Sequence, residues 1–331
     1  MKISVCIPTY KSTGTITETL DSILSQSMGD FEVVICNNSP EDHIALKEIL
    51  DSYDDLRIKF YPNKRNLGYP LNLQKCVRKS KNNIIFLMGS DDVILGFDVF
   101  KKIVEIYKNN PEIGVITRPY YWFDNDVNIP IRYIPKCDRR VISLNDDKKY
   151  IGLLIETLGQ LSGLVYRKDL ITSGFNEHVF TAHIYPFLSI LKTHKCYFWE
   201  NFNIAVRTSS SQTRTLSYIY NPSPTKTWVE MFKNVFIEKK FNNVKNICVD
   251  YITSANYVGL VQIKNYGYYK DLLADIFYLI KYRKRNLVNL KFWFYVIGVL
   301  LIPRFILRRL VDLYKNSYNK KRLFHLVNGK A

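Results

Sequence analysis

Short apolar runs alternate with amphipathic stretches over residues 1–118 of the chain. Runs of β-branched and aromatic residues predict strands, and apolar residues that recur every three or four positions predict helices. The predicted strands cover residues 3–7, 31–36, 56–61, 84–88 and 113–117. Helices are predicted over residues 16–24, 44–50, 71–77 and 97–107. This alternation predicts an α/β fold, in which helices flank a mostly parallel sheet and the crossovers are right-handed.

The pattern becomes less regular after residue 118. Residues 119–144 are aromatic and contain proline, which predicts a loop with short strand pieces. A helix over 147–158, a strand over 161–166, a helix over 185–191 and a last pair of strands within 195–208 are then expected. The polar run 208–225 is the best candidate for a linker. We therefore expect one domain over residues 1–215 and a second, helical region over residues 225–331.

The second region is apolar and basic at once. Its uncharged run, residues 292–303, is short for a membrane span. Residues 281–331 contain 13 Lys and Arg and a single Asp, so about 12 of the 17 excess positive charges lie there. Such a helix is typical of one that lies on an anionic membrane surface. The alternative is a helix docked on the first domain with a solvated basic face.

The composition of the chain indicates the charge of its partner and the cellular compartment in which it works. Of the 331 residues 47% are hydrophobic and 23% are charged, as in an ordinary folded protein, and the net charge of +17 implies an anionic partner. Nucleic acid would need a basic, aromatic groove, whereas the charge gathers around an apolar helix, so we expect no nucleic-acid binding. The six cysteines are scattered without metal-binding spacing, and the N-terminus lacks a secretory signal. We expect a cytoplasmic protein that is peripheral on the inner face of the cell membrane.

The predicted strands end in polar or turn-forming residues, where ligands bind in sheets of this kind. Asp91 and Asp92 come directly after the strand over 84–88. Adjacent carboxylates repel each other, and burial of each costs free energy unless a cation or donors compensate. Helix capping is the alternative, but Asp98 is better placed to begin the next helix. The pair therefore predicts a divalent cation, Mn²⁺ or Mg²⁺, which carboxylate oxygens bind well.

The blocks SVCIPTY, FEVVICNNSPED, RIKFYPNKRNLGYPLN and IIFLMGSDD, in this order and spacing, resemble the nucleotide-binding half of family 2 glycosyltransferases. The segment LSGLVYRKDLITSGFNE, residues 161–177, resembles the acceptor side of that family. The resemblance implies a glycosyltransferase A-type fold and a nucleotide-diphosphate sugar as donor. It also implies that Asp92 is the metal ligand and that Asp91 contacts the ribose or metal-bound water.

Further donor contacts follow from the same resemblance. Pro8, Thr9 and Tyr10 are expected to hold the base and ribose; an ordinary strand-ending turn with a packed tyrosine is the alternative. Asn37 and Asn38 stand where the family usually has an Asp that bonds the base. An amide offers both a donor and an acceptor, so base recognition can persist, but a preference for uracil does not carry over.

Four more residues complete the expected donor site. Arg65 would supply positive charge near the diphosphate, although surface arginines are commonly just solvated. Asn66 would form local hydrogen bonds, and Gly68 would permit a tight backbone turn. Arg207 could reach the diphosphate or the acceptor, as basic residues after this strand do in the family.

An inverting transfer needs a base that takes the proton of the acceptor hydroxyl. The family places an acidic residue near the start of a helix after the segment GFNE, and this chain lacks it. His183 falls nearest that position, Glu177 lies upstream, and Asp91 is a further catalytic candidate. A neutral imidazole is a competent base near pH 7. The alternative is that His183 lines the pocket or the core and that Glu177 is a surface carboxylate.

The sequence thus predicts a metal-dependent, inverting glycosyltransferase of the bacterial type. Its expected acceptor is a polyprenyl-linked saccharide of a surface polysaccharide pathway such as that of an O-antigen. A transferase that acts on polyprenyl phosphate shares the same donor site and is the main alternative. A catalytically inactive relative is another, because the usual base is missing.

Overall fold

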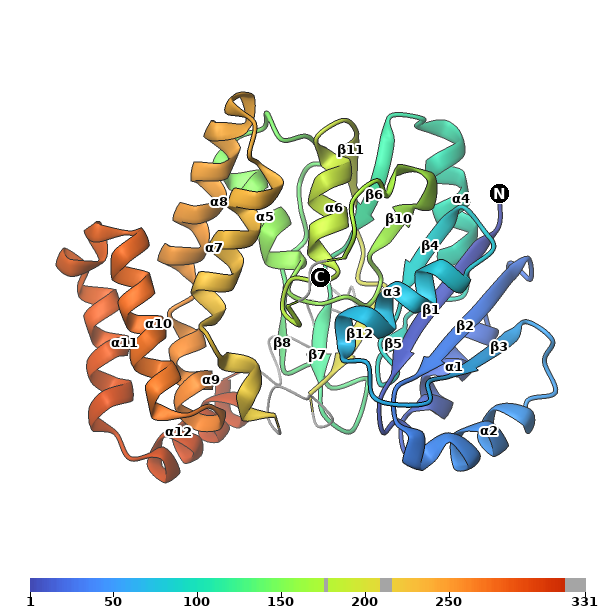
Figure 1. Cartoon of the computed structure of the whole chain (residues 1–331), viewed down its shortest axis with the longest axis horizontal. Helices are drawn as coiled ribbons and strands as arrows, with labels where there is room; N and C mark the ends of the chain where they lie inside the picture. The colour runs from blue at the N-terminus through green and yellow to red at the C-terminus, as the bar shows by residue number, and fades with distance from the viewer. Residues whose placement is uncertain (176–177, 209–215, 319–331) are drawn as a thin grey trace.

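The structure is a computed structural model, which describes residues 1–175, 178–208 and 216–318 and the side chains up to residue 314. An eight-stranded sheet forms its centre, with helices on both faces (Figure 1). The strands of this sheet are β1 (Ile3–Thr9), β2 (Phe31–Asn37), β3 (Ile58–Pro62), β4 (Ile84–Leu87), β6 (Ile113–Thr117), β9 (Val141–Ile142), β10 (Val165–Arg167) and β11 (Lys195–Phe198). Their order is β3-β2-β1-β4-β10-β6-β11-β9. Only β10 and β9 run antiparallel to their neighbours in this sheet, so the prediction of a mostly parallel α/β sheet is confirmed.

Alternate side chains of the strands enter two hydrophobic cores, as the period of two in a pleated strand requires. Val5 and Ile7 of β1 pack on one face with the helices α1 (Ile16–Leu24), α2 (His43–Asp51) and α4 (Val99–Asn109). Cys6 packs on the opposite face with α3 (Tyr69–Lys79), α5 (Lys148–Thr157) and α6 (Ile184–Leu191). Short 3₁₀ helices cover Pro40–Asp42, Lys168–Leu170, Ser217–Tyr220, Lys239–Phe241 and Lys284–Val288.

A second sheet of four short strands lies across the carboxyl end of the main sheet. It consists of β5 (Val93–Ile94), β12 (Ile204–Arg207), β7 (Tyr121–Phe123) and β8 (Arg132–Tyr133), in that order. The expected pairing of two strands within residues 195–208 is wrong. β11 stays in the main sheet beside β6, whereas β12 crosses to β5 and β7. This crossing brings Arg207 next to the residues that follow β4.

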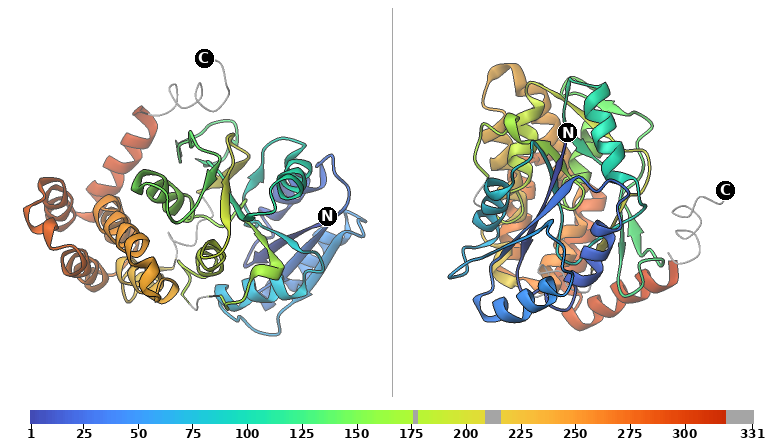
Figure 2. Two further views of the ribbon diagram at one scale, coloured as in Figure 1. Left: turned by 90° about the horizontal axis from the view of Figure 1, so that it is seen from above. Right: turned by 90° about the vertical axis from the view of Figure 1, so that its right-hand side faces the viewer.

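The C-terminal region is helical, as predicted, and its parts pack differently. Its helices are α7 (Pro224–Val235), α8 (Asn242–Ala255), α9 (Val258–Tyr266), α10 (Tyr269–Tyr282), α11 (Leu290–Leu301) and α12 (Arg304–Tyr318). Helices α7 and α8 share the core of α5 and α6, whereas α9–α12 form a separate core that includes Tyr220. Figure 2 shows α10 and α11 at the end of the molecule remote from β3. Within the described residues, no helix has the length and apolar character needed to cross a bilayer.

All six cysteines are free thiols. Five of them are buried, and Cys137 is half-buried. No disulfide bond therefore braces the described part of the fold.

Candidate active site

The candidate site lies at the carboxyl ends of β1, β2 and β4, where parallel strands meet at one edge of the sheet. Thr9 ends β1, Asn37 ends β2, and Asp91 and Asp92 follow β4. The Thr9 hydroxyl donates to Oδ1 of Asn37 over 3.1 Å. The sheet therefore gathers these predicted residues from separate parts of the sequence at one edge.

Asp92 is a buried carboxylate held by donors from two other segments. The hydroxyl of Ser162 donates to its Oδ2, and the backbone N–H of Arg207 donates to its Oδ1 over 2.8 Å. The Ser162 oxygen in turn accepts from the backbone N–H of Gly89 over 2.7 Å. Burial, followed by the charge of Asp91, raises the pKa of Asp92 to about 8 from an ordinary value of 3.8. The charged form of Asp92 thus needs more positive charge than its present donors supply.

The two carboxylates converge beside Gly89. A Cβ placed on this glycine would lie 2.8 Å from Oδ2 of Asp92 and 3.0 Å from Oδ1 of Asp91. In the described residues, no group of three or more His, Cys, Asp or Glu side chains could hold a metal ion. Among the described residues, these two carboxylates are the acidic side chains that converge here, and phosphate and water would supply further ligands to a dication, as they commonly do for Mg²⁺. The donor set fits Mg²⁺ or Mn²⁺ in that form.

The side chain of Arg207 lies across this edge. Its Nη2 pairs with the carboxylate of Glu18, its Nε donates to the backbone oxygen of Asp91 over 3.2 Å, and its Nη1 donates to the backbone oxygen of Asp124 over 3.1 Å. The guanidinium also lies 4.5 Å from the centroid of the Phe123 ring. The structure thus places this predicted residue beside the paired carboxylates, with its charge partly offset by Glu18.

A network of asparagines lies at the ends of β2 and β3. Asn37 is fully buried, and its amide donates to Oδ1 of Asp42 over 2.8 Å and to the backbone oxygen of Ser39 over 3.1 Å. Asn38 donates to Oδ1 of Asn66 over 2.7 Å and accepts from the backbone N–H of Leu67 over 2.7 Å. In this state the amides of Asn37 and Asn38 are engaged within the protein.

The remaining donor-side predictions lie around this network. Pro8 and Tyr10 are half-buried, and Lys11 lies 5.5 Å from the centroid of the Tyr10 ring. Arg65 is exposed in the loop between β3 and α3. Gly68 has a φ of +77° at the start of α3, a conformation that L side chains rarely adopt, so a glycine suits this turn.

His183 lies in the interior at the start of α6. Its Nε2 is 2.9 Å from the backbone oxygen of Leu158, which can only accept, so Nε2 carries a proton. Its Nδ1 therefore accepts from the Tyr69 hydroxyl over 3.1 Å. Burial is the main cause that lowers the pKa of His183 to about 4, so the ring is neutral at pH 7. Glu177 lies outside the described residues.

Three residues at the site did not emerge from the sequence. Ser162 and Glu18 contact Asp92 and Arg207, as described above. Arg118 is fully buried, and its guanidinium donates to the backbone oxygens of Ser162 over 2.6 Å, Thr157 over 3.1 Å and Gln160 over 2.9 Å. A buried arginine that binds three carbonyls fixes the turn that carries Ser162. The small residues of the segment LSGL were the one local signal for this turn.

Residues 4–170, just over half of the chain, match the model of Glycosyl transferase family 2. The chain belongs to this family, and the resemblance stated from its strand-end motifs is confirmed.

Several curated glycosyltransferases are similar to parts of the chain. An uncharacterized glycosyltransferase of Methanocaldococcus jannaschii, MJ1057, is 29% identical over 137 residues, which are 40% of this chain and 47% of that protein. The UDP-Glc:alpha-D-GlcNAc-diphosphoundecaprenol beta-1,3-glucosyltransferase WfgD of Escherichia coli is 24% identical over 33% of this chain and 42% of its own length. The putative glycosyltransferase EpsE of Bacillus subtilis is 30% identical over 33% of this chain and 39% of its own length. The matches thus span less than half the length of these relatives.

Two solved structures share the fold. S. aureus TarS 1-349 in complex with UDP-GlcNAc has a TM-score of 0.65 and 15% identity, over 85% of this chain and 80% of that one. The mannosyltransferase PcManGT from Pyrobaculum calidifontis, in complex with GDP-Man and Mn²⁺, has a TM-score of 0.56 and 13% identity, over 95% of this chain and 88% of that one. The expected glycosyltransferase A-type fold is thereby confirmed.

Proposed function

We propose that the chain is a metal-dependent, inverting glycosyltransferase that moves a sugar from a nucleotide diphosphate to a hydroxyl of a lipid-linked saccharide. The observation that carries this proposal is the convergence of the Asp91 and Asp92 carboxylates beside Gly89. Two proteins of the same fold that were solved with UDP-GlcNAc, or with GDP-Man and Mn²⁺, support the class of donor.

On this proposal, Asp91 and Asp92 hold Mn²⁺ or Mg²⁺ at the tip of β4. The bound ion would supply positive charge to the diphosphate as it leaves the sugar. Arg207 would turn from Glu18 toward the diphosphate, because a phosphate offers it a stronger charge-assisted partner than an exposed carboxylate. Arg65 would approach the diphosphate from the β3–α3 loop.

The base and ribose of the donor would lie along the ends of β1 and β2. Pro8, Thr9 and Tyr10 would line this part of the site, with Tyr10 as a ring against which a base can pack. Asn38 and Asn66 would contact the base only if they exchange their mutual hydrogen bond for one to the nucleotide. Uracil and guanine, the bases in the two solved proteins of this fold, are the two to be tested.

We propose that His183 is the base that takes the proton of the acceptor hydroxyl. The ring is neutral, as a base must be, and the Tyr69 hydroxyl now occupies the Nδ1 lone pair that an acceptor hydroxyl would need. Entry of the acceptor must therefore displace Tyr69. A pKa lowered to about 4 makes this imidazole a weaker base than an ordinary histidine.

The acceptor is proposed to be a polyprenyl-diphosphate saccharide presented at the cytoplasmic face of the membrane, in the synthesis of a surface polysaccharide. WfgD, whose name specifies a diphosphoundecaprenol acceptor, supports this class. So do the exposed apolar side chains of the C-terminal helices, such as Phe294 and Leu301, and the basic residues around them. Transfer to polyprenyl phosphate itself is the alternative, and an assay with that lipid as sole acceptor separates the two.

Thermal unfolding of the chain with a panel of UDP- and GDP-sugars tests the donor class. A ligand that binds the folded state raises the apparent melting temperature. We expect at least one donor to raise it in the presence of Mn²⁺ and to lose this effect in EDTA. Stabilisation that is equal with and without the metal would contradict the proposed role of the carboxylates.

A further inference from the structure

Helix α11 is apolar on two opposite faces. Phe292, Val296 and Val299 are buried in the core of the C-terminal helices. On the opposite face, Leu290, Phe294, Ile297 and Leu301 recur at helical spacing and form what we call the apolar stripe. These four side chains are 87%, 74%, 51% and 76% exposed, respectively. A helix in a water-soluble fold needs only one apolar face, so the apolar stripe calls for a partner.

Helix α12 follows after a short break at Ile302 and Pro303. It buries Leu307 in the same core as α11 and exposes Ile306, Leu310, Leu313 and Tyr314. The adjoining 3₁₀ helix adds Leu287 and Val288, which are 50% and 85% exposed. Residues 287–314 thus expose large apolar side chains more densely than scattered surface hydrophobics would.

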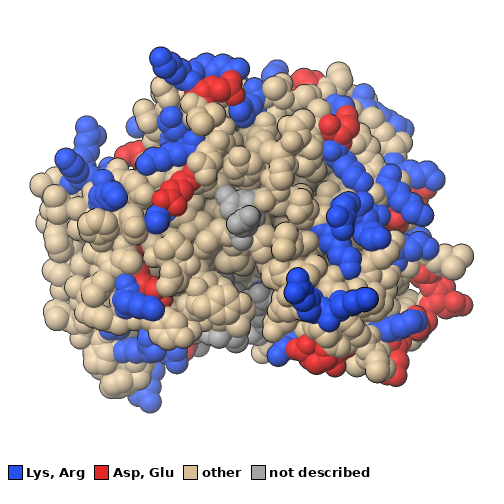
Figure 3. All heavy atoms as spheres, in the orientation of Figure 1, with Lys and Arg blue, Asp and Glu red and all other residues tan. Residues whose placement is uncertain are grey.

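Positive charge surrounds this surface. Residues 281–314 contain eight Lys and Arg and a single acidic residue, Asp312. Figure 3 shows the flank formed by α10 and α11 as largely uncharged, with Lys and Arg above and below it. A second copy of this chain would bring two such positive surfaces together, which repulsion opposes. An anionic lipid surface complements both the apolar side chains and the cations.

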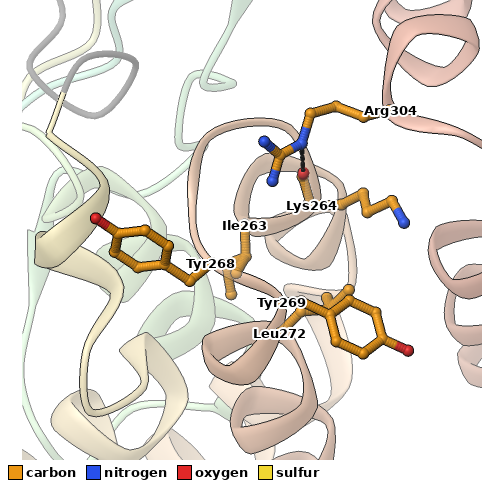
Figure 4. A pocket seen from close by; sticks show the side chains of 6 residues that line it. All are labelled: Ile263, Lys264, Tyr268, Tyr269, Leu272 and Arg304. Atoms are coloured by element: carbon orange, nitrogen blue, oxygen red, sulfur yellow. Dashed lines mark hydrogen bonds between the residues drawn. The ribbon is translucent and has the colours of Figure 1, made fainter.

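A recess of about 240 Å³ lies where α9, α10 and α12 meet, and two cations line it (Figure 4). Arg304 is anchored there, because its Nε donates to the backbone oxygen of Lys264 over 2.8 Å and its Nη2 donates to that of Gly267 over 2.9 Å. Tyr268 and Tyr269 form its aromatic sides. Arg304 follows Leu301 by three residues, so the recess adjoins the end of the apolar stripe and can receive a headgroup phosphate.

The same helices also pack against the acceptor side of the site. Val179 and Phe180, which precede α6, contact the core of α9–α12. The Phe180 ring lies 6.1 Å from that of Tyr220, and a Cβ on Gly267 would meet the Tyr220 ring at 3.0 Å. The segment that leads to His183 is thus tied to the helices that carry the apolar stripe.

We infer that the exposed surface of α11 and α12 docks on an anionic lipid bilayer, and that docking holds the acceptor side of the site at the level of the headgroups. This inference rests on the proposed function for its acceptor, but the docking itself does not depend on catalysis. The bilayer, and no protein partner, is the occupant to which we commit.

Vesicle sedimentation of the full chain tests the docking. With vesicles of phosphatidylcholine and phosphatidylglycerol, we expect binding that is at least tenfold stronger than with phosphatidylcholine alone and that weakens in 1 M salt. The pair Phe294→Glu and Ile297→Glu should weaken binding at least tenfold. The control pair Ile44→Glu and Leu56→Glu places the same charges on exposed apolar sites of the nucleotide-binding half, which are 78% and 88% exposed, and should bind as the parent does.

Two further measurements separate the outcomes. Binding of Mn²⁺ with UDP or GDP should be the same in Phe294→Glu/Ile297→Glu as in the parent, which shows that the variant is folded and leaves the proposed function untouched. Lys264→Gln should reduce the preference for anionic vesicles severalfold. Equal vesicle binding by the parent and the Phe294→Glu/Ile297→Glu variant would overturn the inference. So would a dimer, seen by analytical ultracentrifugation, that this variant dissociates.

Discussion

Gly89→Ala probes the space between the two carboxylates without removing either of them. The new Cβ would lie 2.8 Å from Oδ2 of Asp92, 3.0 Å from Oδ1 of Asp91 and 3.1 Å from Oγ of Ser162, whereas ordinary contacts begin at 3.4 Å. At least one carboxylate must therefore move by roughly 0.6 Å, several times the ~0.2 Å tolerance of a metal–ligand distance. A displacement of about this size costs on the order of 100-fold in rate, or about 2.7 kcal/mol of transition-state stabilisation.

The assay compares glycosyl transfer and Mn²⁺ binding in Gly89→Ala with two control glycines. Gly29→Ala has nothing within 4 Å of its new Cβ and should behave as the parent does. Gly114→Ala meets Ile190 at 2.5 Å, so it should lower the free energy of unfolding by about 1–3 kcal/mol while Mn²⁺ binding persists. Gly89→Ala should lose Mn²⁺ affinity and activity together. Parent-like Mn²⁺ affinity in a folded Gly89→Ala protein would refute the reasoning.

Three other predictions follow from buried polar groups. Because burial raises the pKa of Asp92 to about 8 from 3.8, the folded metal-free chain binds this proton more tightly than the unfolded chain, so its free energy of unfolding should fall as the pH rises between these values. Asp92→Asn should remove that fall. Denaturant titrations in EDTA would measure the free energy of unfolding of the parent and of the variant across this pH range. Parallel pH profiles for the two proteins would count against a raised pKa at Asp92. Asn37→Asp should cost about 3 kcal/mol of stability, because a buried negative charge would replace the amide that donates to the Asp42 carboxylate. The control Asn66→Asp keeps the two hydrogen bonds that Oδ1 of residue 66 accepts, so it should cost little. Equal melting curves for the two variants would disprove this. His183→Asn should lower kcat by about 10²–10⁴-fold, whereas Tyr69→Phe, which frees the Nδ1 lone pair, should stay within about tenfold of the parent. Steady-state rates that His183→Asn leaves unchanged would assign the base elsewhere.

The elements of the fold were largely predictable because their signals are local. The strand that begins at Ile3 and the one that begins at Ile84 show runs of buried apolar side chains, and the predicted ranges of both agree with the structure to within two residues. Strand direction leaves no such local trace. A strand was predicted over residues 161–166, whereas the structure has it over Val165–Arg167, and its antiparallel place between β4 and β6 depends on pairing across the sheet. The crossing of Ile204–Arg207 to a second sheet has the same origin.

Site residues that directly follow a strand could be predicted from the sequence, whereas those that come from other segments could not. Asp91 and Asp92 are conspicuous because two charges end a buried run. Ser162, by contrast, is an ordinary serine until the buried guanidinium of Arg118 fixes its turn against Asp92. The environment of His183 was equally hidden, since burial and the Tyr69 hydroxyl set its hydrogen bonds.

Calorimetric titration of Mn²⁺ into the chain, once with UDP and once with GDP present, tests the central claim most directly. The account predicts that the parent takes up Mn²⁺ with at least one of these nucleotides. The double variant Asp91→Asn/Asp92→Asn, which keeps the size of both side chains, should bind it about 100-fold more weakly, a loss of about 2.7 kcal/mol. Circular dichroism would verify that the variant is folded. Parent-like Mn²⁺ affinity in the folded double variant would contradict the claim that these carboxylates hold the ion.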